Sequence, residues 1–290
     1  MNAHAKINLA LVVGPMRADG KHEVVTVLQR LELADELTLE SANALAVAGF
    51  DGDTIVRAAL TSLAAEARVE PHWRVRIEKR IPVAAGLGGG SSDAATALRL
   101  ANEMLPDPLT DAQLHTLAAD LGADVPFFLT LGTQLGTGDG STLERIELPR
   151  DYTVVLLLPH GAAKESTAAV YAAFDQLHGS AVVPDQEDDV PLMQALRAGD
   201  PRALGAALHN DLQMAALELD PGLAEPLAVA QDAGALGVVV SGSGPTVAAL
   251  GRSRQHALVL AAAFTASGVA DRVLTGAGPV AGARVVSTTD

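Results

Sequence analysis

The clearest chemical signal in the chain is a glycine-rich stretch that leads into alanine-rich sequence. Four of the five residues from Gly86 to Gly90 are glycine, and Ser91 and Ser92 follow directly. Glycines let a backbone approach a ligand closely and turn its N–H groups inward. The unpaired N–H groups and the positive end of a helix starting here would hold an anion. The stretch therefore predicts a polyphosphate site formed by Pro82, Val83, Ala84, Ala85, Gly86, Leu87, Gly88, Gly89, Gly90, Ser91 and Ser92.

Two familiar phosphate motifs fit this stretch poorly. A P-loop has a lysine before its Ser or Thr, whereas Gly90 precedes Ser91. A dinucleotide fingerprint has its third glycine three residues after the second, whereas Gly88 is followed by Gly90 rather than by a glycine at 91. The simpler alternative is a flexible turn in which Ser91 caps the next helix. The continuation Ser-Ser-Asp-Ala-Ala into helical sequence favours phosphate binding.

A lysine and a lone carboxylate are candidates for phosphoryl-transfer chemistry. Lys6 and Asn8 lie two residues apart in an apolar strand, so their side chains share one face. Taken alone, Lys6 fits an edge-strand lysine that points to solvent. Asp124 lies between a helix end and the apolar run that begins at Val125. It fits either a cap or turn aspartate or a general base near a phosphoryl acceptor.

Three further features allow a structural or a functional interpretation. Ser241 to Thr246 is a second Gly/Ser loop between apolar strands, which a hairpin turn would explain. His22 follows Asp19-Gly20-Lys21, a sequence typical of a turn. Tyr171 lies on an expected helix, where core packing is the usual role of an aromatic side chain.

Composition excludes several classes of protein. The 290 residues include 20 Lys plus Arg against 35 Asp plus Glu, which gives a formal net charge of -15. We therefore expect neither a nucleic-acid partner, which requires a basic footprint, nor attraction to an anionic membrane surface. The absence of cysteine excludes disulfides, thiolate metal sites and a cysteine nucleophile. With no segment apolar enough to span a membrane and no signal-peptide pattern, a cytoplasmic enzyme that acts on a small molecule is the expectation.

Hydrophobic periodicity predicts the elements that must position these residues. Expected strands cover 5–13, 24–33, 36–40, 72–78, 144–148, 152–158, 237–240 and 246–250. Expected helices cover 54–68 with Asp53 as N-cap, 93–104, 110–121 with Thr110 as cap, 165–177, 191–198, 201–209, 221–233 and 254–267. The acidic segment 179–190 has no periodicity and is expected to be a solvated loop.

Runs of strands mixed with runs of helices predict an α+β fold rather than a regular parallel sheet. The length fits two ordinary domains. The boundary is expected at Pro149-Arg150-Asp151, which gives an N-terminal domain of residues 1–150 and a C-terminal domain of residues 151–290.

In this order, the motifs resemble those of the GHMP small-molecule kinases over nearly the whole chain. The resemblance rests on five segments, namely 5–9, 19–23, 82–95, 121–126 and 241–246. Within the superfamily, Asp-Gly-x-His and Gly-Ala-Asp-Val-Pro narrow it to kinases that act on a cytidylyl derivative of methylerythritol. It implies a two-domain fold with the active site in the interdomain cleft. It also implies phosphorylation of the 2-hydroxyl of the methylerythritol moiety with ATP and Mg²⁺, in the non-mevalonate route to isoprenoids.

The resemblance also implies roles for individual residues. Lys6 and Asp124 match the catalytic pair, and Pro82 to Ser92 match the ATP-phosphate loop. Asn8 matches a contact to the erythritol part of the substrate, and His22 a contact to the edge of cytosine. Tyr171 falls roughly where the family has an aromatic residue beside the base.

One residue departs from the family pattern. Lys21 stands where the family usually has a tyrosine that stacks on cytosine. This favours the first alternative, another GHMP kinase of the homoserine or mevalonate type, which Asp19-Gly20-x-His22 opposes. A second alternative is a nucleotide-binding protein without turnover, and a distant third is an oxidoreductase with a dinucleotide-binding domain.

Overall fold

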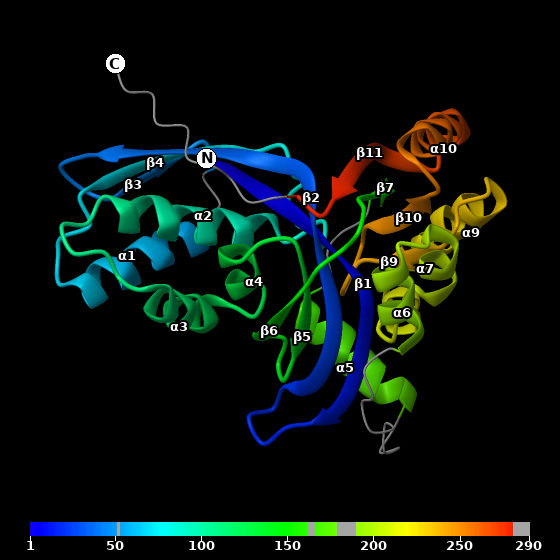
Figure 1. The fold of residues 1–290 in the computed structure, drawn as a ribbon, viewed down its shortest axis with the longest axis horizontal. Coiled ribbons are helices and arrows are strands. Elements are labelled where there is room, and N and C mark those ends of the chain that lie inside the picture. Colours follow the sequence, from blue (N-terminus) through cyan, green and yellow to red (C-terminus); the bar gives the residue numbers. More distant parts are fainter. Residues whose placement is uncertain (51–52, 162–165, 179–189, 281–290) are drawn as a thin grey trace.

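Two β-sheets and the helices packed on them form the molecule in the computed structural model (Figure 1). The structure describes residues 1–50, 53–161, 166–178 and 190–280. Most of the expected loop at 179–190 lies outside these residues. The mixture of mainly antiparallel sheets and helices agrees with the expected α+β class.

The first sheet is built around a long antiparallel hairpin. Within the described residues it has seven strands in the order β3-β4-β2-β1-β8, and β5 pairs with both β2 and β6. Its strands are β1 (Asn2–Met16), β2 (His22–Ser41), β3 (Ala46–Ala48), β4 (Trp73–Glu78), β5 (Thr133–Thr137), β6 (Thr142–Ile146) and β8 (His209–Asn210).

Strand β2 corrects one prediction, because the expected strands 24–33 and 36–40 are a single strand. Its first part pairs with β1 and β5, and its last part, from Glu36 to Ser41, pairs with β4. Half-buried Leu33 and Ala34 and the buried charge of Asp35 interrupt the apolar pattern. The backbone ladder continues through this stretch because Ala34 and Asp35 still pair with β1.

In the described part of the chain, four helices accompany this sheet, and α1 and α2 run along one side of it (Figure 1). They are α1 (Ile55–Ala67), α2 (Gly89–Glu103), α3 (Asp111–Leu121) and α4 (Val125–Leu129). Alanines of α2 pack closely against leucines of α1 and of the sheet in one apolar core. The N-cap of α1 is Thr54 rather than the expected Asp53, but the Asp53 carboxylate still accepts hydrogen bonds from the N–H groups of Val56 and Arg57. The expected cap Thr110 is confirmed and forms a capping box with Gln113.

The second sheet has four antiparallel strands in the order β11-β7-β10-β9 within the described chain. They are β7 (Tyr152–Pro159), β9 (Val238–Val240), β10 (Val247–Gly251) and β11 (Ala270–Gly278). The associated helices are α5 (Thr167–His178), α6 (Val190–Ala198), α7 (Pro201–Ala207), α8 (Gln213–Leu219), the short 3-10 helix η1 (Pro221–Leu223), α9 (Ala224–Asp232) and α10 (Arg254–Ser267). The expected helix 221–233 is thus a 3-10 turn followed by an α-helix.

The two sheets are in contact. Strand β8 pairs in parallel with Ala10 and Leu11 of β1, although it comes late in the chain. Strand β11 packs against β2, and a side chain at Gly278 would meet the carbonyl oxygen of Arg30 at 2.1 Å. The expected boundary at 149–151 falls between β6 and β7, and the chain beyond it still adds a strand to the first sheet.

Candidate active site

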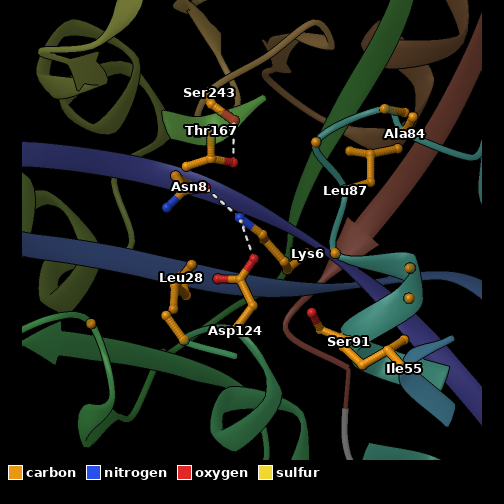
Figure 2. A pocket seen from close by; sticks show the side chains of 18 of the residues that line it. Lys6, Asn8, Leu28, Ile55, Ala84, Leu87, Ser91, Asp124, Thr167 and Ser243 are labelled. Carbon is orange, nitrogen blue, oxygen red and sulfur yellow. Dashed lines mark hydrogen bonds and ion pairs between the residues drawn. The ribbon is translucent and has the colours of Figure 1, made fainter. Parts of the chain in front are cut away.

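A cavity of about 560 Å³ lies where the elements from the two halves of the chain meet. Its walls come from β1, β2, the glycine-rich loop, the start of α4 and the turn after β5, together with α5 and the turn after β9. Figure 2 shows Lys6, Asp124, Ser91 and Thr167 around this space. Of the predicted site residues, Lys6, Asn8, Asp124, Tyr171 and residues 82–91 line it.

Lys6 is the charged centre of the cavity. Its Nζ donates a hydrogen bond of 2.8 Å to Asn8 Oδ1 and lies 3.3 Å from Asp124 Oδ2 (Figure 2). Asn8 is oriented in turn by its 2.8 Å hydrogen bond to Thr26 Oγ1. The expected shared face of Lys6 and Asn8 is confirmed.

The alternative of a solvent-facing edge lysine is wrong. At Lys6, strand β1 pairs with β2 on one side and the Lys6 N–H donates to the Leu87 carbonyl on the other, and the Lys6 side chain is 7% exposed. A buried ammonium without a partner is costly, so Asn8 and Asp124 also stabilise Lys6 where it lies. Asp124 is more accessible, at 39% exposed, and its side chain makes no capping hydrogen bond to α4. Its carboxylate is therefore available to a ligand.

The glycine-rich loop curves along the opposite wall of the cavity. Gly86 and Gly88 have φ values of +76° and +71°, a backbone region that favours glycine. Ala84 also has a positive φ of +57°, a strained conformation for alanine. Helix α2 begins at Gly89, inside the glycine run, with Gly88 as N-cap, so Ser91 is not the cap and lies in the first turn. Ser92 is buried and does not line the cavity.

Three hydrogen bonds hold the loop in this position. The N–H of Lys6 donates to the carbonyl of Leu87 at 2.9 Å, which ties the loop to the strand that carries the lysine. Thr246 Oγ1 donates to the carbonyl of Ala85 at 2.6 Å, and Ser241 Oγ to that of Gly86 at 3.5 Å. The segment 241–246 is the expected turn between β9 and β10, and it also supports the glycine-rich loop.

His22 and Tyr171 lie together at one end of the site. Their rings stack with centroids 5.4 Å apart and an interplanar angle of 23°. His22 Nδ1 lies 2.8 Å from the carbonyl of Gly14, which can only accept, so Nδ1 carries a proton. Tyr171 lines the cavity, and its burial together with the nearby Asp124 charge raises the pKa of its hydroxyl to about 12. His22 lies behind it, outside the lining residues.

Sequence analysis missed a buried ionic cluster beneath the glycine-rich loop. Lys79 Nζ lies 2.5 Å from Asp35 Oδ2 and 2.8 Å from Asp93 Oδ2. Asp35 also accepts hydrogen bonds from the backbone N–H groups of Arg80 and Ile81. Burial raises the pKa of Asp93 to about 7; Lys79 lowers it and Asp35 adds to the rise. The available signal was Asp93 beside the alanines near the start of α2, because a charge on a buried helix requires a partner.

Comparisons with known proteins agree with this architecture. The family model described as GHMP kinases N terminal domain matches residues 53–132, and the model described as GHMP kinases C terminal matches residues 192–270. A 4-diphosphocytidyl-2-C-methyl-D-erythritol kinase from Nocardia farcinica is 43% identical over 295 residues, covering 99% of this chain and 95% of the relative. The chain belongs to the GHMP kinase family.

Two solved structures are similar in fold to this GHMP kinase. A crystal structure of 4-(cytidine 5'-diphospho)-2C-methyl-D-erythritol kinase matches with a TM-score of 0.81 and 32% identity, covering 96% of this chain and 98% of the other. Mevalonate kinase from L. major in complex with R-mevalonate matches with a TM-score of 0.76 and 18% identity, covering 97% and 96%. The second match shows a shared fold alone.

Family membership removes two of the alternatives. GHMP kinases are ATP-dependent small-molecule kinases, so this chain is an enzyme of that class rather than a binding protein without turnover. The mainly antiparallel sheets also exclude the parallel sheet of a dinucleotide-binding oxidoreductase. In the described part of the chain, no helix has the length and apolar character needed to cross a membrane.

Proposed function

We propose that this kinase transfers the γ-phosphoryl group of ATP to the 2-hydroxyl of 4-diphosphocytidyl-2-C-methyl-D-erythritol, in the non-mevalonate route to isoprenoid precursors. The observation that carries the proposal is the high identity, over nearly the full chain, to a relative named for that substrate. Support from the site is the Lys6–Asp124 pair in a cavity that also contains an aromatic end at Tyr171.

In the proposed reaction, Asp124 accepts the proton of the substrate hydroxyl. Its carboxylate faces the cavity and is not used for capping, so it is free to contact an acceptor. Lys6 lies within reach of both Asp124 and the reacting oxygen, and its positive charge offsets the negative charge that develops there. Asn8 fixes the lysine ammonium and contacts the erythritol part of the substrate.

The glycine-rich loop holds the triphosphate in this proposal. Positive φ values at Gly86 and Gly88 turn the backbone toward the cavity, and the N-terminal end of α2 adds unpaired N–H groups. Phosphoryl transfer depends mainly on such positioning and on charge neutralisation. The acidic chain can thus bind anions through local donors despite its net charge of -15.

We also propose that Mg²⁺ accompanies ATP and neutralises phosphate charge. Among the described residues, no group of three or more His, Cys, Asp or Glu side chains could hold a metal ion. This fits Mg²⁺, which binds through substrate phosphates with one or two protein ligands and several waters. The Ser91 hydroxyl lines the cavity beside the glycine-rich loop and is the side chain that would take this part.

His22 and Tyr171 recognise the cytidine end in this proposal. Tyr171 offers a ring at the cavity wall, and His22 stacks behind it with its Nε2 3.1 Å from Asp175 Oδ1. Hydrogen bonds from this histidine to the edge of the base would discriminate against ligands that cannot pair with it. We further propose that residues 1–150 and 151–290 form the two domains, and that the enzyme works in the cytoplasm.

An ADP-release assay with a panel of acceptors tests the proposed substrate. Purified enzyme, ATP and Mg²⁺ would be combined with the cytidylyl substrate, mevalonate and homoserine in parallel. We expect ADP release with the cytidylyl substrate alone. Turnover of mevalonate or homoserine in its place would assign the chain to another GHMP activity, and this alternative is kept because the mevalonate kinase fold is so similar.

A further inference from the structure

The Asp139 carboxylate is held in the cavity wall by the hydrogen bonds of a tight turn. Asp139 lies between β5 and β6, flanked by Gly138 and Gly140, which have φ values of +71° and +94°. Its Oδ1 accepts hydrogen bonds from the N–H of Ser141 at 3.2 Å and from Ser141 Oγ at 2.6 Å. Aspartate is favoured in turns because it makes such bonds to its own backbone. Asp139 and Gly140 line the cavity, so the turn leaves a negative charge on its wall.

This charge opposes the proposed substrate, which carries a diphosphate. The hydrogen bond from Lys21, with further bonds from Ser141, holds the pKa of the Asp139 carboxyl at about 2. The carboxylate is therefore ionised at any physiological pH. A second anion brought to this wall is repelled unless a cation offsets the charge of Asp139.

Lys21 provides that cation from the turn between β1 and β2, although it does not itself line the cavity. Its Nζ lies 2.7 Å from Asp139 Oδ2, although the residues are 118 positions apart in the chain. The Lys21 side chain is 59% exposed, whereas that of Asp139 is 20% exposed. The pair thus joins the turn between β1 and β2 to the turn between β5 and β6.

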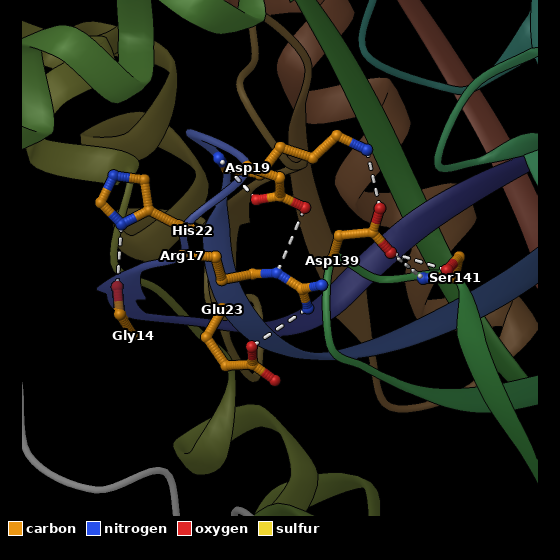
Figure 3. Close-up of polar contacts among 8 residues, drawn as sticks. Gly14, Arg17, Asp19, His22, Glu23, Asp139 and Ser141 are labelled. Carbon is orange, nitrogen blue, oxygen red and sulfur yellow. Dashed lines mark hydrogen bonds and ion pairs between the residues drawn. The ribbon is translucent and has the colours of Figure 1, made fainter. Parts of the chain in front are cut away.

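The surrounding charges do not replace Lys21. Arg17 lies 3.4 Å from Asp19 and 3.2 Å from Glu23, so two carboxylates already share its charge (Figure 3). These residues with Lys21 and Asp139 make two cations and three anions. Without Lys21, the three carboxylates of this group would share a single guanidinium.

We propose that Lys21 is a specificity-determining residue that neutralises Asp139 on the cavity wall and thereby admits the diphosphate-bearing substrate. This inference rests on the proposed function. Lys21 touches neither of the proposed catalytic side chains in the structure, so it acts on substrate binding rather than on the chemical step.

A double-mutant cycle tests the inference through the KM of the cytidylyl substrate. Lys21→Met keeps the alkyl stem and removes the charge, and we expect it to raise KM about 3- to 10-fold with kcat within about two-fold. Asp139→Asn keeps an oxygen that can accept the hydrogen bonds of the turn, and its KM should be equal to or lower than that of wild type. The double variant should return to within about two-fold of wild type, because it removes the repelling charge as well. Lys21→Arg should retain the wild-type KM, and KM for ATP should not change in any variant.

The outcomes of these measurements distinguish a failure of this inference from a failure of the proposed function. If Asp139→Asn alone raises KM as much as Lys21→Met, the pair is a structural bridge between two turns and the inference is overturned. An unchanged KM in Lys21→Met also overturns it, while wild-type turnover leaves the proposed function intact. Wild-type enzyme that does not use the cytidylyl substrate overturns both. A KM effect that does not shrink at about 0.5 M salt contradicts an electrostatic origin at this exposed site.

Discussion

At the scale of single residues, Asp124 is placed for chemistry. It caps no helix through its side chain and is 39% exposed, and Asn8 remains a partner of Lys6, so its neutral isostere should still fold. We predict that Asp124→Asn lowers kcat by on the order of 10²–10⁴, the range that a general base contributes. Binding of a non-hydrolysable ATP analogue, measured by calorimetry, should survive. A folded variant with near-normal kcat would remove Asp124 from the mechanism.

Asp93 gives the stability of the enzyme a specific pH dependence. Its pKa is about 7 in the folded protein, mainly because it is buried, whereas the ordinary value is 3.8. Folded protein therefore binds this proton more tightly than unfolded protein, so the free energy of unfolding falls as pH rises from about 4 to 7 and levels off above that. Asp93→Asn removes this contribution. We predict that the stability of the variant relative to wild type increases between pH 5 and 7 and is constant from pH 8 upward.

Urea unfolding of both proteins at pH 5, 6, 7 and 8 measures this difference directly. Carboxyl groups remote from the Lys79 cluster titrate equally in the two proteins and cancel in the comparison. A constant difference across the four pH values would mean that Asp93 stays ionised throughout, held by Lys79 in spite of its burial.

At the scale of elements, the glycines of the glycine-rich loop look alike in the sequence but differ in the space available for a side chain. A Cβ at Gly88 would lie 2.7 Å from Phe128 Cζ and 2.9 Å from Lys6 Cγ, and the φ of +71° disfavours any side chain. A Cβ at Gly90 would meet nothing closer than 3.6 Å. We predict that Gly88→Val weakens binding of an ATP analogue at least ten-fold, since it distorts both the loop and Lys6.

Gly90→Ala is the matched control for folding. It lies in the first turn of α2 without a positive φ, so its melting temperature should equal or exceed that of wild type. The effect of Gly89→Val should be intermediate between those of Gly88→Val and Gly90→Ala, because a Cβ at Gly89 meets Ile81 Cγ2 at 3.1 Å. Unchanged ATP affinity in a folded Gly88→Val protein would mean that the loop does not contact phosphate.

The same scale shows which elements the sequence could predict. The helix 110–121 and the strands 72–78 and 152–158 were predicted well, because each buries one clear periodic face or an apolar run. Strand β11 was missed, since it ends in Gly276 and Gly278, whose missing side chains serve its packing against β2. The two-residue strand β8 and the five-residue helix α4 are too short to show a period.

At the scale of the whole molecule, the site depends on contacts between residues far apart in the chain. Sequence motifs gave Lys6 and Asp124 as candidates, but their 3.3 Å separation follows from the fold. Lys79 carried no motif, and its two carboxylates come from β2 and α2. Spacing along one chain reports on one element at a time. The aspartate in α2 could therefore indicate a buried partner but could not identify that partner as Lys79.

Thr246 is a point where the second sheet supports the phosphate loop of the first half. Its hydroxyl is fully buried and donates a 2.6 Å hydrogen bond to the Ala85 carbonyl, 161 residues away. Thr246→Val preserves the shape and leaves that carbonyl unpaired, which costs about 1–3 kcal/mol. We predict a lower melting temperature together with weaker binding of an ATP analogue, because the loop loses its support from the turn 241–246.

Thr61→Val is a suitable control for this prediction. Thr61 also donates to a backbone carbonyl, that of Arg57 at 2.8 Å, but it is exposed on α1 and remote from the loop. Water replaces its lost hydrogen bond, so its stability should change by less than about 0.5 kcal/mol. If the Thr246 variant melts and binds nucleotide like the Thr61 variant, the two halves do not depend on this bond. If it loses stability and nucleotide affinity together, the second sheet takes part in shaping a phosphate site whose residues all come from the first half.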